Sequence, residues 1–494
     1  MKTAIIGGGI AGLAAAFELE QARQAGAAVT YTLFEAGDRL GGSLASEIVD
    51  GAVLERGPDS FLTEKPAATE LCRELGLGSD LIPSNDAARK TYIVVKNQLV
   101  ALPDGLMFLV PTKLIPTAMT RLFSLPTKIR MGLELLHPPR QHGDGDEAVA
   151  TLVERHFGAE AVERLADPLL SGIYGGDATQ LSARTVLPRL VEMEHEYGSL
   201  TRGMLAAHKQ MRAKAKAAAQ SHAANGNGNG KASTNGRPAR SIFTTLRGGL
   251  QQLVDALTAR LDPASVRLST PVSGLARMEG RWKVTAGGTA EFYDSVIVAS
   301  PAWAAGVLLR PVDAQLGEDL GTIPYSSSIT VNLIYDESQL GPLPDGFGFL
   351  VPGSEGRAML ACTFVHRKFL GRTPPGKAVL RAFLGGMKNE DLLAEPDAAL
   401  IATVRRELRE ILGDHVMSPL AEPERAQVSR WRRAMAQYAV GHQERIQRIT
   451  AQVASLSGLR LAGNAYDGIG IPDCIRLGRR AAKELVGQLT ASNQ

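Results

Sequence analysis

Residues 1–35 constrain the fold of this 494-residue chain more than any other stretch. A short apolar run at 3–6 meets the glycine-rich sequence 7–12, which has the spacing Gly-x-Gly-x-x-Gly, and a helix-forming run follows at 13–19. A second apolar run at 29–34 ends at Glu35, about twenty residues beyond the last glycine. Strand, glycine turn, helix, strand and acid in this order predict a βαβ unit with a parallel sheet.

Each glycine of this turn has a separate physical role. Gly7 permits the tight turn, Gly9 lets the backbone approach a pyrophosphate, and Gly12 lets the helix pack against the strand. The free N–H groups and partial positive charge of the helix N-terminus favour an anion there. Glu35 can accept hydrogen bonds from a ribose hydroxyl and would repel a 2′-phosphate. A purely structural turn is the alternative, but the full register favours a dinucleotide held by Gly7, Gly8, Gly9, Ile10, Ala11, Gly12, Glu35 and Ala36.

A second glycine pair distinguishes between dinucleotides. Arg39-Leu40-Gly41-Gly42 follows the acid closely. A nicotinamide dehydrogenase needs no such pair, whereas a protein that holds FAD in an extended form uses one. Gly41 and Gly42 would let the backbone pass the pyrophosphate, and Arg39 would supply positive charge. The sequence therefore predicts FAD.

The chain ends on a similar arrangement of strand, glycine loop and helix. An apolar run at 459–462 leads through Gly463 to Gly470, and a helix is expected to continue to Leu489. Backbone N–H groups near Gly470 and Ile471, with the helix dipole, would stabilise negative charge on the pyrimidine end of a reduced flavin. FAD would thus be held by separated segments, with both chain ends on one domain. The predicted contacts in this loop are Gly463, Ile469, Gly470 and Ile471.

Composition excludes several classes of protein. Lys+Arg (54) nearly balances Asp+Glu (51), so the net charge of +3 gives no reason to expect nucleic-acid binding. The three cysteines and nine histidines are scattered without metal-ligand spacing, which predicts no metal, no disulfides and a reducing compartment. The first strand begins at the N-terminus, which leaves no signal peptide, and no apolar run is long enough to span a bilayer. We expect a cytoplasmic protein.

Between the two ends, the pattern predicts a helix over 61–85, a hairpin at 91–103 and a helix over 147–166. A proline-punctuated apolar segment at 106–126 favours short core helices. The alternative is a surface that dips into the inner face of a membrane, with Lys113, Arg121 and Lys128 toward the headgroups. The glycine-rich stretch 167–177 is interpreted as a loop that brings backbone near a ligand.

The second half returns to the sheet and then forms another lobe. Strands between 266 and 299 are expected to rejoin the dinucleotide sheet. A second lobe over 301–425 contains alternating strands and a helix near 397–412. The composition at 213–241, rich in Asn, Gly, Ala and Ser, predicts a disordered insertion.

These motifs together resemble the bacterial protoporphyrinogen and coproporphyrinogen III oxidases of the flavin amine oxidase superfamily. The matching stretches are 7–12, the Arg-x-Gly-Gly at 39–42, 55–61, 168–177 and 468–474. The resemblance runs nearly end to end and implies an α/β fold, with a Rossmann-like FAD-binding domain of the glutathione reductase type. It adds a mixed-sheet substrate domain and a helical, membrane-leaning domain. The implied domains are FAD-binding 1–85, 242–300 and 426–494; substrate-binding 86–105 and 301–425; and helical 106–212.

The resemblance also implies site residues. Ser43 is an implied cofactor contact, although it stands where the family usually has a basic residue, whose phosphate or ribose contact a serine does not reproduce. Val272 would pack at the adenine end and Trp431 near the flavin. The implied loop contacts are Gly57, Pro58, Asp59 and Ser60.

The implied reaction oxidises a porphyrinogen to a porphyrin in three two-electron steps of haem biosynthesis. Hydride passes to non-covalently bound FAD, and O₂ then accepts the electrons to give hydrogen peroxide. We find no catalytic side chain and treat the flavin as the catalyst. Substrate propionates need cations, for which Lys65 and Lys90 are candidates, while Ile173 and Gly175 are candidates to line the site. The membrane-bound eukaryotic enzymes carry an arginine where Thr91 stands, which favours coproporphyrinogen III over protoporphyrinogen IX without deciding between them.

Three rivals share parts of this pattern. A flavin amine oxidase is expected to surround its flavin with aromatic residues, which are only 5% of this chain, and no cysteine precedes Tyr466 for covalent attachment. A carotenoid desaturase would lack the 171–177 stretch. A prenyl-binding chaperone of the same fold would have no reason to keep both glycine segments. The sequence leaves open a homodimer and peripheral membrane contact.

Overall fold

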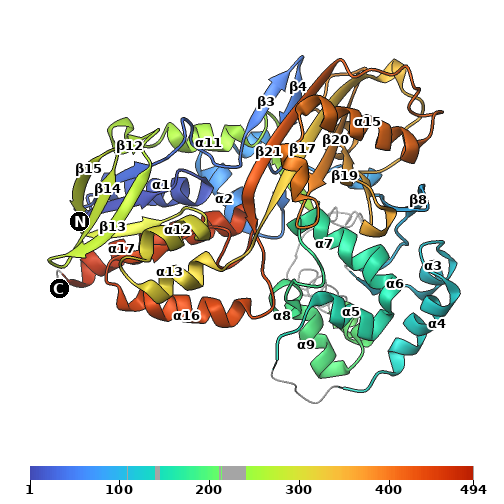
Figure 1. The fold of residues 1–494 in the computed structure, drawn as a ribbon, viewed down its shortest axis with the longest axis horizontal. Coiled ribbons are helices and arrows are strands. Elements are labelled where there is room, and N and C mark those ends of the chain that lie inside the picture. The colour runs from blue at the N-terminus through green and yellow to red at the C-terminus, as the bar shows by residue number, and fades with distance from the viewer. Residues whose placement is uncertain (108, 140–144, 211–212, 214–240, 493–494) are drawn as a thin grey trace, which may run out of the picture.

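The computed structural model describes residues 1–107, 109–139, 145–210, 213 and 241–492. Its first layer is a five-stranded parallel sheet of order β12-β2-β1-β16-β22 (Figure 1). The strands come from both ends of the chain: β1 Lys2–Ile6, β2 Thr30–Phe34, β12 Val266–Arg267, β16 Ser295–Val298 and β22 Leu459–Leu461. The predicted βαβ unit is present, because β1 and β2 are joined through α1 Ile10–Gln24.

Successive residues of β1 enter different cores, because side chains of a strand alternate between its two faces. Ile5 packs with α1, α11 Gln251–Thr258 and α17 Ile471–Ser492. Ala4 and Ile6 pack on the other face with β16 and with a separate antiparallel sheet. That sheet contains β13 Val272–Met278, β14 Arg281–Ala286 and β15 Thr289–Tyr293.

The expectation that every strand between 266 and 299 rejoins the dinucleotide sheet is therefore wrong for three of them. Tight turns at Gly280 and at Gly287-Gly288, all with positive φ, connect β13, β14 and β15 as hairpins. Hairpin-connected neighbours must run antiparallel, so they cannot extend a parallel sheet. Only β12 and β16 return to it.

The second lobe is a seven-stranded mixed sheet of order β21-β17-β20-β19-β18-β7-β8, as the predicted mixed-sheet domain requires. Helix α15 Asp397–Leu412 packs on one face. The strands are β7 Thr91–Val95, β8 Gln98–Ala101, β17 Tyr325–Asp336, β18 Gly348–Leu350, β19 Met359–Phe364, β20 Lys377–Gly385 and β21 Arg425–Ala436.

Two expected domain boundaries differ from this arrangement. The boundary between 425 and 426 falls inside β21, which pairs with β17 along its length, so the chain leaves this sheet only after Ala436. Helices α12 Ala302–Leu309 and α13 Ala314–Gly321 were expected in the second lobe. They pack instead in the core beside β16, because almost every residue of α12 is apolar and needs that cover.

A helical region lies below the second sheet in Figure 1 and has its own core. A short β-ribbon precedes its helices. Its elements are β9 Leu106–Met107, β10 Val110–Pro111, α3 Leu114–Met119, α4 Leu125–Leu133, α5 Val149–Phe157, α6 Ala159–Ala161, a π-helical turn Val162–Ala166, α7 Asp167–Tyr174, α8 Ala183–Val186, α9 Pro188–Tyr197 and a helix over 200–210. Among the described helices, none combines the length and apolar character needed to cross a bilayer. The insertion expected at 213–241 lies, except for its first and last residues, outside the described residues.

Two expected elements are wrong. The helix expected over 61–85 is only α2 Pro66–Glu74, flanked by β5 Phe61–Leu62 and β6 Leu81–Pro83, because β11 Phe243–Leu246 pairs with both strands. The loop expected over 167–177 is helical to Tyr174. Pro168 occupies its first turn, where proline is tolerated, and Gly175 ends it with φ +57°. Gly172 serves close packing instead, since an added Cβ would lie 3.0 Å from Leu350.

Four other strands and α-helices complete the fold that the structure describes. They are β3 Ser46–Val49, β4 Ala52–Glu55, α14 Val365–Lys368 and α16 His442–Ser455. Helix α16 packs on the core shared with α13.

Candidate flavin site

The two glycine segments of the N-terminal region lie side by side at the carboxyl edge of the parallel sheet. Gly41 N–H donates to Gly8 O at 2.8 Å, and Gly9 and Gly41 form an isolated parallel bridge. Gly41 and Gly42 both have positive φ, +101° and +59°, which favours glycine there. The carboxyl edge of such a sheet is where ligands of this class of fold bind.

The glycines of the first loop differ in their surroundings: Gly7 and Gly12 are closely packed, whereas Gly9 faces open space. A Cβ on Gly12 would lie 1.9 Å from Gly7 O, and Gly7 itself has φ +108°. A Cβ on Gly9 would meet nothing within 4 Å. Gly9 therefore presents bare backbone to an opening at the start of α1, followed by Ile10 and Ala11. This geometry fits a pyrophosphate at the helix N-terminus.

Glu35 lies beside this opening. Its carboxylate accepts Gly8 N–H at 2.7 Å and Gly37 N–H at 2.8 Å, one on each oxygen, which leaves lone pairs for a ribose. Thr270 N–H donates to Glu35 O at 2.8 Å, so Val272, at the start of β13, lies close to the same edge. Ala36 follows Glu35 in the connection between these contacts.

Arg39 folds the second glycine loop. Its guanidinium donates to the carbonyls of Leu40 and Leu44, each at 3.1 Å, and to that of Gly42. Burial lowers the pKa of Arg39, with a contribution from the nearby Arg56. The guanidinium of Arg39 therefore holds the second glycine loop in shape through hydrogen bonds to the loop's own carbonyls.

The loop at 57–60 continues this surface. A Cβ on Gly57 would lie 1.9 Å from Ser43 O and 3.5 Å from the Trp431 ring, so Ser43, Gly57 and Trp431 are in contact. The Trp431 indole N–H donates to Arg56 O at 2.7 Å. The structure thus gathers three residues that are far apart in sequence.

The Asp59 carboxylate has protein partners already. Lys368 Nζ lies 2.9 and 3.1 Å from its two oxygens, and Ser60 Oγ donates at 2.6 Å. Burial opposes ionisation, but Lys368 and Arg381 hold the pKa of Asp59 well below its usual range. Asp59 and Ser60 therefore use their side chains on each other and on Lys368, and half-buried Pro58 precedes them.

The C-terminal glycine loop is fixed by a buried tyrosine. Tyr438 OH accepts Gly468 N–H and donates to Asn464 O, both at 2.9 Å. Gly463 has φ +135° at the end of β22, and Ile471 begins α17. Ile469 and Gly470 complete the turn. The loop therefore presents a helix N-terminus at the same edge of the sheet.

Lys65 lies under this loop. Its ammonium pairs with the buried Asp473 carboxylate at 2.6 Å, and a Cβ on Gly468 would lie 2.3 Å from Asp473 Cγ. The candidate propionate cation is thus committed to a carboxylate within the protein.

Two further polar groups at this edge were not predicted from the sequence. Ser300 Oγ and Tyr466 OH are buried and find no hydrogen-bond partner within the part of the chain that the structure describes. Ser300 follows β16, and a Cβ on Gly7 would lie 3.0 Å from its N atom. Ser300 could have been predicted from the sequence, because a polar residue that directly follows the apolar run of a central parallel strand lies at the edge where ligands bind. Buried polar groups need partners, so both fit an absent polar ligand.

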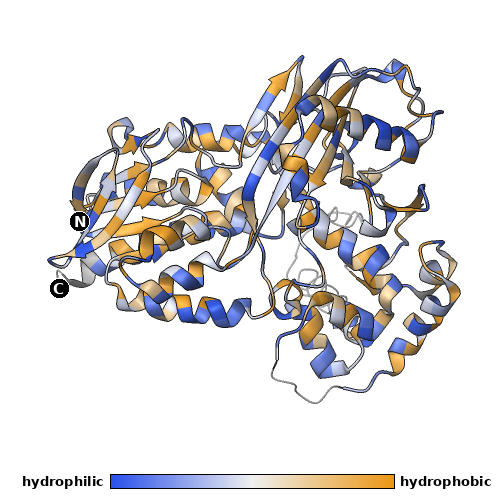
Figure 2. Cartoon of the chain, viewed as in Figure 1, coloured by the Kyte–Doolittle hydropathy of each residue, from blue (hydrophilic) through white to orange (hydrophobic). Residues whose placement is uncertain are grey.

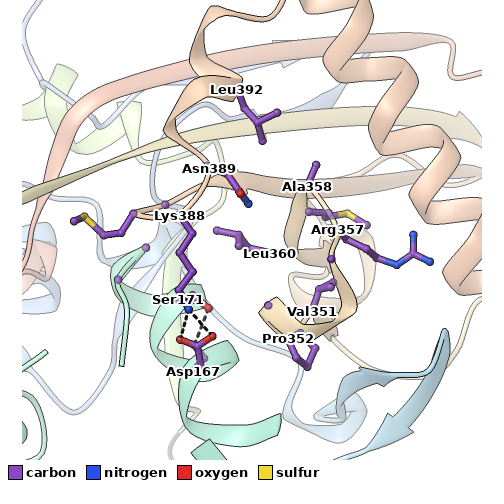
Figure 3. A pocket seen from close by; sticks show the side chains of 18 of the residues that line it. Asp167, Ser171, Val351, Pro352, Arg357, Ala358, Leu360, Lys388, Asn389 and Leu392 are labelled. Carbon is purple, nitrogen blue, oxygen red and sulfur yellow. Dashed lines mark hydrogen bonds and ion pairs between the residues drawn. The ribbon is translucent and has the colours of Figure 1, made fainter. Parts of the chain in front are cut away.

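A cavity of about 380 Å³ opens between α7 and the ends of β18, β19 and β20 (Figure 3). Gly175 lines it, while Leu360 projects into it and Lys388 spans its rim to pair with Asp167 at 3.1 Å. Lys65, Lys90 and Ile173 are not among its lining residues. Ile173 is exposed on α7, and Lys90 lies at the opposite end of β7, because Thr91 pairs with Gly348 and Ile93 with Leu350.

The family model for flavin-containing amine oxidoreductases matches residues 10–486 of this chain. Coproporphyrinogen III oxidase of Bacillus subtilis is 34% identical over 98% of this chain and 98% of its own length. The chain belongs to the flavin-containing amine oxidoreductases, in the branch of the porphyrinogen oxidases. It is thus a flavin-dependent oxidoreductase.

Other porphyrinogen oxidases extend this similarity. Chloroplastic protoporphyrinogen oxidase of Nicotiana tabacum is 29% identical over 98% of this chain and 85% of the relative. A crystal structure from Exiguobacterium, assigned provisionally as a protoporphyrinogen oxidase, has a TM-score of 0.83 at 32% identity and covers 99% of both chains. The family predicted from the motifs is confirmed, and the similar full-length relatives are named porphyrinogen oxidases.

Proposed function

We propose that this flavoenzyme binds FAD without a covalent bond and oxidises a porphyrinogen to a porphyrin. The observation that carries the cofactor proposal is the open backbone at Gly9 beside Glu35, which fits the pyrophosphate and adenosine ribose of a dinucleotide. The second glycine pair, Gly41 and Gly42, packed against this loop, favours FAD among dinucleotides. Burial raises the pKa of the Cys474 thiol to about 12, so this cysteine at the start of α17 stays a neutral thiol that does not attack a flavin. The proposed contacts are those predicted from the sequence, together with Ser300.

FAD held by these residues would supply the hydride acceptor, and O₂ is the proposed final electron acceptor, which would give hydrogen peroxide. The residues of the chain hold and orient the reactants. Gly470 and Ile471 would hold the pyrimidine end of the flavin, and their backbone N–H groups with the positive end of the α17 dipole would stabilise negative charge there. Porphyrin aromaticity favours the product, so the site needs no side-chain base.

The substrate proposal comes from the relatives together with the cavity at Gly175. Several bacterial relatives over nearly the full length are named coproporphyrinogen III oxidases, which favours the substrate with four propionates. Lys65 stays a proposed propionate contact, although its ammonium already pairs with Asp473. Lys90, exposed at the far end of β7, would act at the outer edge of the substrate.

The test offers coproporphyrinogen III and protoporphyrinogen IX separately to the FAD-loaded protein in air. Porphyrin fluorescence and hydrogen peroxide are followed against a control without enzyme. We expect faster turnover of coproporphyrinogen III, with three molecules of peroxide for each porphyrin formed. Turnover of amines without turnover of either porphyrinogen would contradict the proposal.

A second proposal concerns an apolar surface on the helical region, which we call the α3–α4 surface. Leu125, Ile129 and Leu133 repeat every four residues along α4 and are 70%, 55% and 56% exposed. Figure 2 shows apolar residues along α3 and α4 at the outer edge of this region. The surface also includes Ile115 and Met119 of α3, and Leu136.

Part of the segment 106–126 is buried, as the core-helix interpretation expected, and part is exposed, as the membrane-surface interpretation expected. Val110, Leu122 and Phe123 are buried in the helical core, as the core interpretation expected. Lys113, Arg121 and Lys128 lie beside or between the apolar residues of the α3–α4 surface in the chain, and none of the three is buried. An apolar stripe accompanied by such cationic residues fits peripheral contact with an anionic leaflet, which we propose for the inner face of the membrane.

Vesicle flotation tests this contact. The wild-type protein is expected to float with vesicles of phosphatidylglycerol and phosphatidylcholine at low salt, and a Leu125→Ser, Ile129→Ser, Leu133→Ser variant is expected to remain below. The matched control replaces three exposed apolar residues elsewhere, Val307, Leu370 and Leu420, by serine. Equal flotation of the two triple variants would contradict the proposal.

A further inference from the structure

A cluster of buried charges lies behind the loop at 57–60. Arg372 pairs with Glu55, whose other oxygen accepts Ser46 Oγ at 2.6 Å. Lys368 pairs with Asp59 at 2.9 Å. Arg381 of β20 completes the cluster. Three cations thus face two carboxylates, and the side chains of all five are at most 14% exposed.

Arg381 carries the charge that this cluster leaves uncompensated. It is 1% exposed, and one terminal nitrogen donates to Gly57 O. The other terminal nitrogen lies 3.8 Å from Asp59 Oδ2, which Lys368 already holds. This nitrogen and Nε have no hydrogen-bond partner among the residues that the structure describes. The Phe383 ring also lies near the guanidinium, 4.7 Å from its carbon.

An excess buried cation is costly unless a negative group lies near it. Burial lowers the pKa of Arg381, while Asp59 and Glu55 oppose that shift. A guanidinium nevertheless stays protonated in proteins, so it cannot relieve the cost by losing its proton. Breaking the balance of a buried ionic group typically costs several kcal/mol. The positive charge of Arg381 therefore stabilises any nearby group that gains negative charge.

The cluster touches the proposed cofactor site through Gly57, whose carbonyl accepts a hydrogen bond from Arg381. At one end, Gly57 packs on Ser43, next to the paired glycine loops. At the other end, the same segment continues to Lys65, which pairs with Asp473 under the loop at 468–470. The segment that Arg381 holds therefore runs from the pyrophosphate loops to the N-terminus of α17.

We propose that Arg381 raises the reduction potential of the flavin by placing uncompensated positive charge beside its site. This inference rests on the proposed FAD binding. Uptake of a hydride brings two electrons and one proton, so the cofactor gains one negative charge, which a fixed cation stabilises. Lys368 and Arg372 contribute little, because each is neutralised by its own carboxylate.

The test measures the midpoint potential of bound FAD by equilibration with a reference dye in the absence of substrate. Arg381→Met is expected to lower the equilibrium constant for reduction about tenfold, which is about 30 mV for a two-electron couple. Asp59→Asn removes one negative charge from the same cluster and is expected to shift the potential upward. Arg381→Lys keeps the charge and is expected to stay near the wild-type potential.

Opposite signs separate this electrostatic role from a structural one, because damage to the 57–60 loop would weaken FAD binding in both variants without moving the potential in opposite directions. Arg155→Met, which removes a paired arginine of the helical region, is the control and should leave the potential unchanged. An unchanged potential in Arg381→Met, or shifts of the same sign in Arg381→Met and Asp59→Asn, would overturn the inference. If Arg381→Met does not fold, Asp59→Asn and Arg381→Lys still decide it. A wild-type protein that binds no FAD would refute the proposed cofactor instead.

Discussion

Gly9 and Gly12 are three residues apart, yet a methyl group has opposite consequences at the two positions. Gly12→Ala would place Cβ against Gly7 O, so we expect the apo protein to lose stability by about 3 kcal/mol, as in severe overpacking. Gly9→Ala meets open space and keeps an ordinary φ of −67°, so the apo protein should keep its stability within about 0.5 kcal/mol. The same methyl group would occupy the cofactor's place and weaken FAD binding at least tenfold.

Denaturant unfolding of the apo proteins and FAD titration by flavin fluorescence check these two effects separately. Gly321→Ala is the matched control, because a Cβ there also meets nothing within 4 Å and lies far along the chain, in α13. It should change neither quantity. Wild-type FAD affinity in Gly9→Ala would show that this opening is not the cofactor site.

Residue roles were predictable from the sequence where chemistry and spacing act locally. The glycine loops and Glu35 meet at one edge because strand, turn and helix follow one another along the chain. The partners of Lys65 were not predictable, because Asp473 lies in a different segment and no local pattern joins them. The role of Ser300 could be predicted only if the preceding strand, β16, was known to lie inside the parallel sheet.

At the scale of elements, a buried histidine joins the helices beneath the α3–α4 surface. His156 of α5 lies 2.8 Å from Glu134, which follows α4, and 3.1 Å from Glu194 of α9. Glu134 also accepts Leu200 N–H at 2.6 Å and so caps the helix over 200–210. Burial opposes protonation of His156, but the hydrogen bonds to both carboxylates raise its pKa. Burial likewise opposes ionisation of Glu194, but His156 and Arg155 lower the pKa of Glu194 to about 2.

These shifts give a pH window with a defined sign. The raised pKa of His156 means that its contribution is complete below the unfolded value of about 6.5 and is lost as pH rises through the folded value. The lowered pKa of Glu194 means that its contribution is complete above about 4.5 and is lost as pH falls toward 2. His156→Gln should therefore destabilise the helix over 200–210 by about 3 kcal/mol between these limits, and by less at higher pH.

Amide hydrogen exchange of that helix measures the effect across pH. His415→Gln, at an exposed histidine in the second lobe, is the control and should leave exchange in the helical region unchanged. A His156→Gln effect that does not diminish at alkaline pH would contradict a protonated His156.

Elements were predicted best where periodicity alone determines them. The strands of the βαβ unit and the hairpin at 91–103 have strong local patterns, and the structure contains them. The stretch 167–177 was misjudged because its glycines suggest a broken backbone, whereas Gly172 allows helix α7 to approach Leu350. The region 61–85 was misjudged because β11, from a distant segment, pairs with both ends of it.

For the whole molecule, three cysteines provide a simple probe of the packing. Cys72, Cys362 and Cys474 are all buried, and burial raises the pKa of Cys72 and Cys474 to about 12 and that of Cys362 as well. Because only a thiolate reacts readily, the native protein should show no rapid labelling by a disulfide reagent at pH 8. Three thiols should react after guanidinium denaturation. Rapid labelling of one native thiol would place it at an opening that this packing excludes.

The overall topology also determines how strongly cofactor binding depends on folding of the whole chain. The parallel sheet combines strands from residues 2–6 and 459–461, and the proposed FAD contacts come from both ends and from the 39–60 segment. A ligand held by segments this far apart binds the folded chain and not the unfolded one. The sequence predicted this closure, but not the membership of β21, α12 and α13, because those depend on which apolar faces meet in space.

We therefore expect FAD to stabilise the whole protein. At a concentration of one hundred times its dissociation constant, FAD should raise the free energy of unfolding by about 2.7 kcal/mol, measured by denaturant unfolding of apo protein with added cofactor. NAD at the same concentration should stabilise the protein less, because it shares the adenosine and pyrophosphate contacts of the first loop but gains nothing from the second glycine pair and the C-terminal loop. Gly9→Ala should lose about half or more of the FAD effect, because a tenfold weaker affinity leaves about 1.4 kcal/mol at this FAD concentration. Gly321→Ala should keep the full effect, since only the first substitution occupies the opening beside Glu35. Equal stabilisation by NAD, or none by FAD in the wild type, would show that the two glycine segments come together for another ligand.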